Sequence, residues 1–217
     1  MTTLEGRAAY ELWADTYPAI AHNPLMRVEQ EIVEPLLAQL RAARALDVGT
    51  GSGRYVPVLQ ATGATVVGLD FSLAMLAHAN GRRVCADACR LPVRRGAFDL
   101  VNASLMVGDV EHLETWTREM ARALSAGGHL VYSDFHPSWA RHGWRRTFRT
   151  ATGVQHDVSF HAHAIDDHLA ALEGAGLRVR AIREPRFKDD FDPDVKAFRR
   201  RWGNPQVVVV FHAVKEP

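Results

Sequence analysis

Residues 45–70, ALDVGTGSGRYVPVLQATGATVVGLD, decide the fold of this chain. The stretch opens with a short apolar run and then carries three glycines at alternate positions, Gly49, Gly51 and Gly53, a pattern typical of a strand that turns sharply into a helix. The first N–H groups of a helix over residues 55–61 point back at this loop, where a small anion is favoured. A second apolar run ends at Asp70, the position where a doubly wound sheet places the acid that binds a ribose diol.

Two kinds of cofactor use such a loop, and the spacing of the glycines separates them. A dinucleotide site has the pattern G-x-G-x-x-G, and its third glycine position is Arg54 here. This chain has G-x-G-x-G instead, with Asp47 two residues before the first glycine. A cofactor that lacks phosphate and has an amino-acid end suits this loop, because its carboxylate can bind the loop N–H groups and Asp47 its ammonium, directly or through water. S-adenosylmethionine is such a molecule.

Residues 46–53, LDVGTGSG, resemble the first motif of the class I S-adenosylmethionine-dependent methyltransferases, and residues 67–70, VGLD, are similar to the family's second strand with its ribose-binding acid. Three further stretches match the family in the expected order: CADA at 85–88, FDLV at 98–101 and LSAGGHL at 124–130. A series of matches in order is far more specific than one glycine loop.

The resemblance implies an α/β fold, a Rossmann-like, doubly wound and mostly parallel seven-stranded sheet with an antiparallel last strand and N-terminal capping helices. A length of 217 residues favours a single domain. We expect one methyltransferase domain over residues 1–217: cap helices in 1–43, the cofactor-binding core in 44–134, an insertion near the substrate in 135–165 and the C-terminal part of the sheet in 166–217.

The resemblance also implies the residues that contact S-adenosylmethionine and its product S-adenosylhomocysteine. Tyr17 closes the pattern Tyr10-x-x-Trp13-x-x-x-Tyr17, which resembles an aromatic pattern at the start of many small-molecule members, although an aromatic core stripe explains it equally well. Phe71 is expected beside the adenine and Asp87 near its amino group. The predicted cofactor-binding residues are Tyr17, Asp47, Gly49, Thr50, Gly51, Gly53, Asp70, Phe71, Met75, Asp87, Ala88 and Ser104.

Signals on the acceptor side are weaker. Relatives often carry histidines at positions 108 and 109, and this chain has Gly108 and Asp109 there. The insertion contains four arginines and several aromatic residues, which fit a solvated basic lid over buried aromatics, or sites for an anionic group and an apolar ring on an acceptor. The predicted substrate-binding residues are Asp109, Trp139, Arg145 and Arg149.

Catalysis by this family needs a base only if the acceptor is protonated at the working pH. His136 is the first candidate, because it follows the predicted fifth strand at the edge of the crevice and imidazole titrates near neutrality. His112, His161 and His163 are alternatives, as is a reaction without a base. We expect no metal site, since no series of carboxylates accompanies the histidines of residues 161–168.

Composition excludes several classes of function. The 26 basic and 25 acidic residues give a net charge of +1, whereas dedicated nucleic-acid and membrane-surface binders normally have a strong basic excess. No apolar run approaches the length of a membrane span. The sequence predicts a soluble, cytoplasmic protein, a monomer or homodimer, with a small-molecule acceptor and with Cys85 and Cys89 as buried free thiols.

The predicted function is transfer of a methyl group from S-adenosylmethionine to the oxygen, nitrogen or carbon of a small molecule by in-line displacement. Two alternatives stay open at the level of sequence. One is an NAD(P)-dependent oxidoreductase built on a similar glycine loop, and the other is a non-catalytic protein that binds S-adenosylmethionine.

Overall fold

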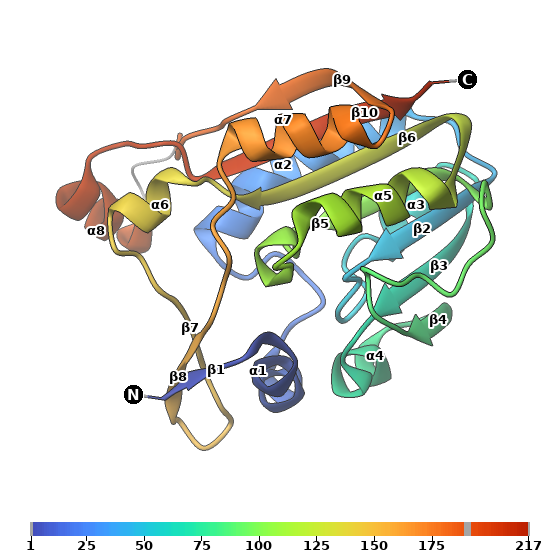
Figure 1. Ribbon diagram of the computed structural model, residues 1–217. Helices are drawn as coiled ribbons and strands as arrows, with labels where there is room; N and C mark the ends of the chain where they lie inside the picture. Colours follow the sequence, from blue (N-terminus) through green and yellow to red (C-terminus); the bar gives the residue numbers. More distant parts are fainter. Residues whose placement is uncertain (1, 189–191, 217) are drawn as a thin grey trace.

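A seven-stranded sheet organises the computed structural model, which describes residues 2–188 and 192–216 (Figure 1). In sheet order the strands are β4 (Arg82–Cys85), β3 (Thr65–Asp70), β2 (Arg44–Val48), β5 (Phe98–Ser104), β6 (Leu124–Phe135), β10 (Val208–Lys215) and β9 (Leu177–Arg183). Neighbouring strands from β4 to β6 are parallel, while β10 runs antiparallel to both of its neighbours. This topology confirms the predicted fold class.

Helices cover both faces of this sheet (Figure 1). On one face, α2 (Pro24–Gln39) and α3 (Val56–Ala61) bury a core that includes Val33, Leu37 and Leu59. On the other, α5 (Leu113–Ala123) and α7 (Ile165–Gly174) pack around the fully buried Trp116 and Leu172. Apolar side chains project from both faces of the parallel strands into these two cores. In the sequence, the strands therefore appear as nearly continuous hydrophobic runs.

A smaller layer lies beyond the carboxyl ends of the parallel strands, in the lower part of Figure 1. It contains α1 (Gly6–Trp13), the 3-10 helix η1 (Ala14–Thr16) and a three-stranded sheet in the order β1 (Thr3–Leu4), β8 (Gln155–Val158) and β7 (Arg146–Arg149). The start of the chain therefore pairs with a hairpin strand 154 residues later in the sequence, through the parallel partners Thr3 and Asp157.

Four short helices complete the fold. They are α4 (Leu73–His78), η2 (Val107–Asp109), α6 (Ser138–Arg141) and α8 (Pro193–Trp202). In the described part of the chain, no helix is long and apolar enough to cross a membrane.

One expectation from the sequence differs from the structure. The prediction of buried thiols is wrong, because Cys85 is exposed and Cys89 is half-buried. The physical reason is that β4 is the edge strand of the sheet, with a partner on one side only.

Candidate active site

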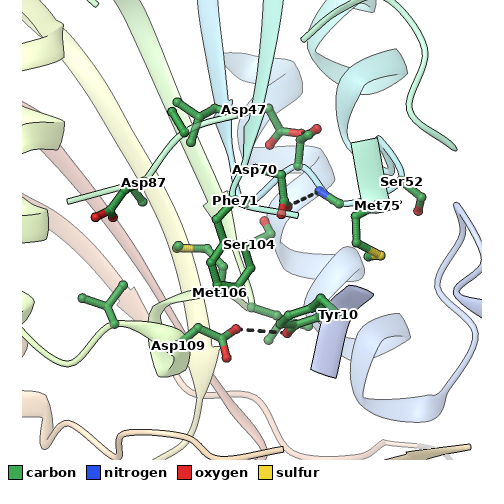
Figure 2. A pocket seen from close by; sticks show the side chains of 18 of the residues that line it. Tyr10, Asp47, Ser52, Asp70, Phe71, Met75, Asp87, Ser104, Met106 and Asp109 are labelled. Atoms are coloured by element: carbon green, nitrogen blue, oxygen red, sulfur yellow. Dashed lines mark hydrogen bonds between the residues drawn. The ribbon is translucent and has the colours of Figure 1, made fainter. Parts of the chain in front are cut away.

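The glycine loop follows β2 and lies directly over Asp70. Gly49, Gly51 and Gly53 all have positive φ, and a Cβ on Gly49 would lie 2.7 Å from the side chain of Met106. Other residues are therefore strained at these positions. The N–H of Gly51 donates to Oδ2 of Asp70 at 2.8 Å, which fixes the loop against the end of β3 (Figure 2).

Asp70 is a buried carboxylate that is held rigidly. Its Oδ1 accepts a hydrogen bond of 2.9 Å from the N–H of Ser72, the residue that also caps α4 through Met75. Burial raises the pKa of Asp70 to about 6, which backbone N–H groups partly oppose. A carboxylate in this position is ready to accept hydrogen bonds from the hydroxyls of a bound ligand.

Asp47 lies on the same side of the loop. It accepts hydrogen bonds from Oγ1 of Thr50 at 2.6 Å and from Nδ2 of Asn102 at 2.7 Å. Burial raises the pKa of this carboxyl. Two acids therefore flank the glycine loop, one at the end of each neighbouring strand.

A first cavity of about 270 Å³ opens beside this loop (Figure 2). Eleven of the twelve predicted cofactor residues line it; the exception is Gly53, whose carbonyl accepts from the N–H of Val56. The lining also contains residues that the sequence analysis did not assign to the cofactor: Tyr10, Ser52, Arg54, Tyr55, Leu69, Ala86, Cys89, Leu105, Met106, Asp109, Val110, Glu111 and His112.

Arg54 is the one Lys or Arg side chain in the lining of this cavity among the described residues. Its Nη1 donates to Oε2 of Glu29 at 2.9 Å, and its guanidinium lies 4.3 Å from the ring centre of Tyr55. Glu29 is fully buried on α2 and also accepts from Tyr55 and Ser133. The rest of the lining includes five acidic residues, which suits a cofactor with a diol, an ammonium and one carboxylate better than a pyrophosphate.

A second cavity, of about 420 Å³, shares Tyr10, Tyr17 and Leu105 with the first. Its lining is rich in aromatic side chains: Tyr10, Trp13, Tyr17, Phe135, Trp139, Trp144, Phe187 and Phe198. Leu105 has a φ of 55°, and among the described residues it is the one non-glycine residue with positive φ. Strained backbone of this kind is found at functional sites, and here it places Leu105 in the wall between the two cavities.

A buried ionic cluster joins the cap to this wall. Arg146 on β7 forms an ion pair with Asp109 of η2, and their side chains are only 5% and 7% exposed. The hydroxyl of Tyr10 donates to Oδ2 of Asp109 at 3.0 Å and accepts from Nη1 of Arg146 at 3.3 Å (Figure 2 shows Tyr10 and Asp109). We call these three residues the clamp. It links α1, η2 and the hairpin, three elements far apart in the sequence.

The predicted acceptor residues fall in different places. Trp139 lines the second cavity, and its Nε1 donates to the carbonyl of Val207 at 2.8 Å. Arg145 lines it too, but its exposed side chain pairs with Asp157. Arg149 is exposed, lines neither cavity and donates to the carbonyl of Gly153. The buried arginine of the insertion is Arg146, which the alternation of β7 could have revealed, since Phe148 lies on the same face.

The structure does not bring His136 to either cavity. Its side chain is buried, Nδ1 accepts from the N–H and hydroxyl of Ser138, and Nε2 donates to Glu184 at 2.9 Å. Nε2 of His163 donates to the carbonyl of Val110, while His112 lines the first cavity. No group of three or more His, Cys, Asp or Glu side chains is arranged to hold a metal ion within residues 2–188 and 192–216.

Comparisons with known proteins agree with this architecture. A family model described as a methyltransferase domain matches residues 46–132. The chain is similar to the demethylmenaquinone methyltransferase of Mycolicibacterium gilvum, with 39% identity over 97 residues, 43% of this chain and 42% of that protein. It is also 33% identical to the malonyl-[acyl-carrier protein] O-methyltransferase of Enterobacter lignolyticus over 159 residues, 70% of this chain and 63% of that protein.

A crystal structure of an S-adenosylmethionine-dependent methyltransferase from Mesorhizobium loti superposes with a TM-score of 0.66 and 25% identity, covering 83% of this chain and 96% of that one. By contrast, the chain spans less than two thirds of the length of each of the two curated relatives. The domain match over residues 46–132, the sheet topology and the glycine loop over Asp70 together identify a class I S-adenosylmethionine-dependent methyltransferase domain in these residues.

Proposed function

We propose that the protein transfers the methyl group of S-adenosylmethionine, bound in the first cavity, to a small molecule bound in the second. The observation that carries this proposal is the shared wall of Tyr10, Tyr17 and Leu105, which brings the two cavities together at one point. Transfer of a methyl group requires donor and acceptor to lie close together, and two cavities with three lining residues in common are neighbours.

The residues of the first cavity fit the cofactor's functional groups. We assign Asp70 to the ribose hydroxyls, Asp47 to the ammonium, Arg54 to the carboxylate and Asp87 to the adenine amino group, with Phe71 packing beside the ring. When bound, the cofactor supplies an activated methyl group on a sulfonium. The chain then has to orient the acceptor and exclude water, which the aromatic walls of the second cavity are suited to do.

The cap and the insertion supply most of the second cavity's lining, which supports the division of the chain into cap, core and insertion. The two curated relatives are named for different substrates, demethylmenaquinone and malonyl-[acyl-carrier protein], so they give no common acceptor. The aromatic lining of the second cavity and the near-neutral net charge support a small acceptor rather than nucleic acid, and we propose a cytoplasmic monomer or homodimer.

Calorimetric titration with S-adenosylhomocysteine, NAD and NADP tests the cofactor assignment. We expect S-adenosylhomocysteine alone to bind, and Asp70→Ala to weaken it by roughly 1.5–3 kcal/mol, the usual value of hydrogen bonds to a charged group. Asp166→Ala, an exposed acid outside both cavities, is the matched control. Binding of a nicotinamide cofactor instead would support the oxidoreductase alternative.

Methyl transfer itself is tested with labelled S-adenosylmethionine and a metabolite extract, followed by mass spectrometry of labelled products. We expect a labelled small molecule that is absent with the Asp70→Ala variant. Tight cofactor binding without any labelled product would favour the non-catalytic alternative.

A further inference from the structure

His22 lies in the segment between η1 and α2, beside the shared wall of the two cavities. Its half-buried ring lines the second cavity and packs edge-on against Tyr17, with ring centres 5.2 Å apart. Tyr17 in turn lines both cavities. This histidine is therefore one aromatic ring away from the point where the cavities meet.

The hydrogen bond of His22 fixes which nitrogen carries its proton. Nδ1 lies 3.3 Å from the carbonyl oxygen of Ile20, which can only accept, so Nδ1 carries the hydrogen. Nε2 consequently holds a free lone pair, and no other described residue forms a hydrogen bond with it. A neutral imidazole held by a backbone carbonyl in this way is the usual arrangement of a proton acceptor.

The surroundings keep this ring neutral. Burial lowers the pKa of His22 and the cation of Arg54 lowers it further, while the carbonyl of Ile20 acts in the opposite direction. The other titratable or charged side chains that line the second cavity are Tyr10, Tyr17, Arg145, Arg146 and Asp194.

None of these other groups is as well placed to accept a proton. Burial raises the pKa of both Tyr10 and Tyr17, so their hydroxyls keep their protons near neutrality. Asp109, the acid at the clamp, is paired with Arg146. Asp194 is exposed on α8 and does not line the first cavity.

The walls of the second cavity indicate the shape and charge of the acceptor. Eight aromatic side chains line it, and both of its arginines are already paired with aspartates, Arg145 with Asp157 and Arg146 with Asp109. Aromatic walls favour flat rings through stacked and edge-on contacts, and paired cations attract an anion only weakly. A flat, uncharged aromatic molecule suits such a cavity.

We propose that His22 is the general base of the methyl transfer and that the acceptor is a flat aromatic molecule with a phenolic hydroxyl. In this step the O–H bond breaks and its proton moves to Nε2 of His22, while an oxygen electron pair forms the new bond to the methyl carbon. The electron pair of the broken carbon–sulfur bond stays on the sulfur of S-adenosylmethionine, which becomes neutral. The imidazolium then releases its proton to solvent. The proposal rests on the proposed function.

The test compares the wild-type protein with His22→Asn, whose side-chain amide can keep the hydrogen bond to Ile20 without offering a base. His78→Asn, an exposed histidine on α4 that lines neither cavity, is the matched control. The probe acceptors are 1-naphthol and the more acidic 4-nitro-1-naphthol, and formation of each methyl ether is followed by mass spectrometry. Binding of S-adenosylhomocysteine by calorimetry verifies that each variant is folded.

We expect His22→Asn to lower kcat for 1-naphthol about 100-fold with little change in KM, within the usual range for loss of a general base. The deficit should largely disappear with 4-nitro-1-naphthol at a pH where that acceptor is already ionised. In the wild-type protein, kcat/KM for 1-naphthol should fall as the pH drops through the pKa of His22, because the protonated ring cannot accept a proton. In the His22→Asn variant, kcat/KM for 1-naphthol should not show this fall at low pH.

If His22→Asn methylates 1-naphthol at the wild-type rate, His22 is not the general base, while the methyltransferase function stands. Equal slowing with both acceptors would overturn it as well, because that result indicates a structural role. If the wild-type protein binds S-adenosylhomocysteine but methylates neither naphthol, the acceptor class is wrong. The labelled metabolite extract then decides separately whether the protein is a methyltransferase.

Discussion

Arg54 is the residue that most clearly separates this site from a dinucleotide site. In the dinucleotide pattern the third glycine stands at this position and lets the helix pack closely on the strand. Here the guanidinium lines the cavity and is balanced by the buried Glu29. The charge is thus fixed in place before any ligand arrives, which reduces the cost of ordering it on binding.

The role of Arg54 is tested by comparing two ligands. The double variant Arg54→Gln/Glu29→Gln avoids leaving a buried charge without its partner, and we expect it to weaken S-adenosylhomocysteine binding by roughly 1.5–3 kcal/mol. Methylthioadenosine, which has no carboxylate, should bind the variant and the wild type alike in calorimetric titrations. Equal weakening of both ligands would mean that the pair supports the fold rather than the carboxylate.

Asp134, at the end of β6, makes stability depend on pH. Its buried Oδ1 accepts from the N–H groups of Gly108 and Phe135, and burial raises its pKa to about 7. Because the folded state then binds more protons than the unfolded state between about pH 4 and pH 7, this group makes the free energy of unfolding fall as the pH rises through that range.

Asp134→Asn removes this titration and can keep the accepting oxygen. We expect the variant to gain on the order of 2 kcal/mol relative to wild type at pH 8 and much less at pH 5, as measured by urea denaturation. Asp166→Asn serves as the exposed control. A stability difference that is the same at both pH values would contradict the role given to Asp134.

Residues whose position follows from a local pattern could be placed from the sequence. The glycine turn after β2 lies against Asp70 at the end of β3, so spacing alone predicts where these residues lie. His22, the proposed base, and Arg146 were not predicted, because they are recognised only by their contacts across the fold, with Tyr17 and with Asp109. His136 was chosen for its place after a strand, and only the structure shows both of its nitrogens bonded away from the cavities.

At the scale of elements, the parallel core and the N-terminal helices were predictable, and the small sheet formed by β1 and the hairpin was not. Strands that are buried on both faces appear in the sequence as continuous apolar runs. These runs show where along the chain each strand lies. The pairing of β1 with β8 leaves no such signal, because two residues at the start of the chain meet a hairpin strand far away. The clamp likewise joins residues far apart in the sequence, here through side chains.

The clamp gives a prediction for the elements that it joins. Arg146→Met leaves Asp109 buried with only Tyr10 as a partner, and we expect a loss of about 3–5 kcal/mol in the free energy of unfolding. Arg146→Met/Asp109→Leu removes both charges, so it should recover much of that loss in the same urea denaturation experiment. A double variant no more stable than the single one would show that the two charges do not act as a pair.

At the scale of the whole molecule, two layers have different tasks. The central sheet supplies the glycine loop and its acids, whereas the cap and the hairpin close the site from the other side (Figure 1). Tyr10 and Tyr17 belong to the cap and line the first cavity, so a bound cofactor contacts both layers at once.

Hydrogen exchange measures this coupling between layers. We expect S-adenosylhomocysteine to slow amide exchange in α1, η1 and the hairpin strands β7 and β8, because cofactor binding stabilises the state in which the clamp is closed. Amides of β5 and β6, in the centre of the sheet, should change least. The Asp70→Ala variant is the control, and uniform protection over the whole chain would contradict a separate response of the cap.

The place of β10 has a consequence for the protein while it is being made. A ribosome delivers β9 before β10, yet β10 lies between β6 and β9 and bonds to both. A nascent chain that has reached residue 200 therefore carries β9 with no neighbour and leaves one side of β6 open. The sheet is complete only when residue 215 has left the exit tunnel, so until then the unpaired side of β6 is open to pairing with other chains.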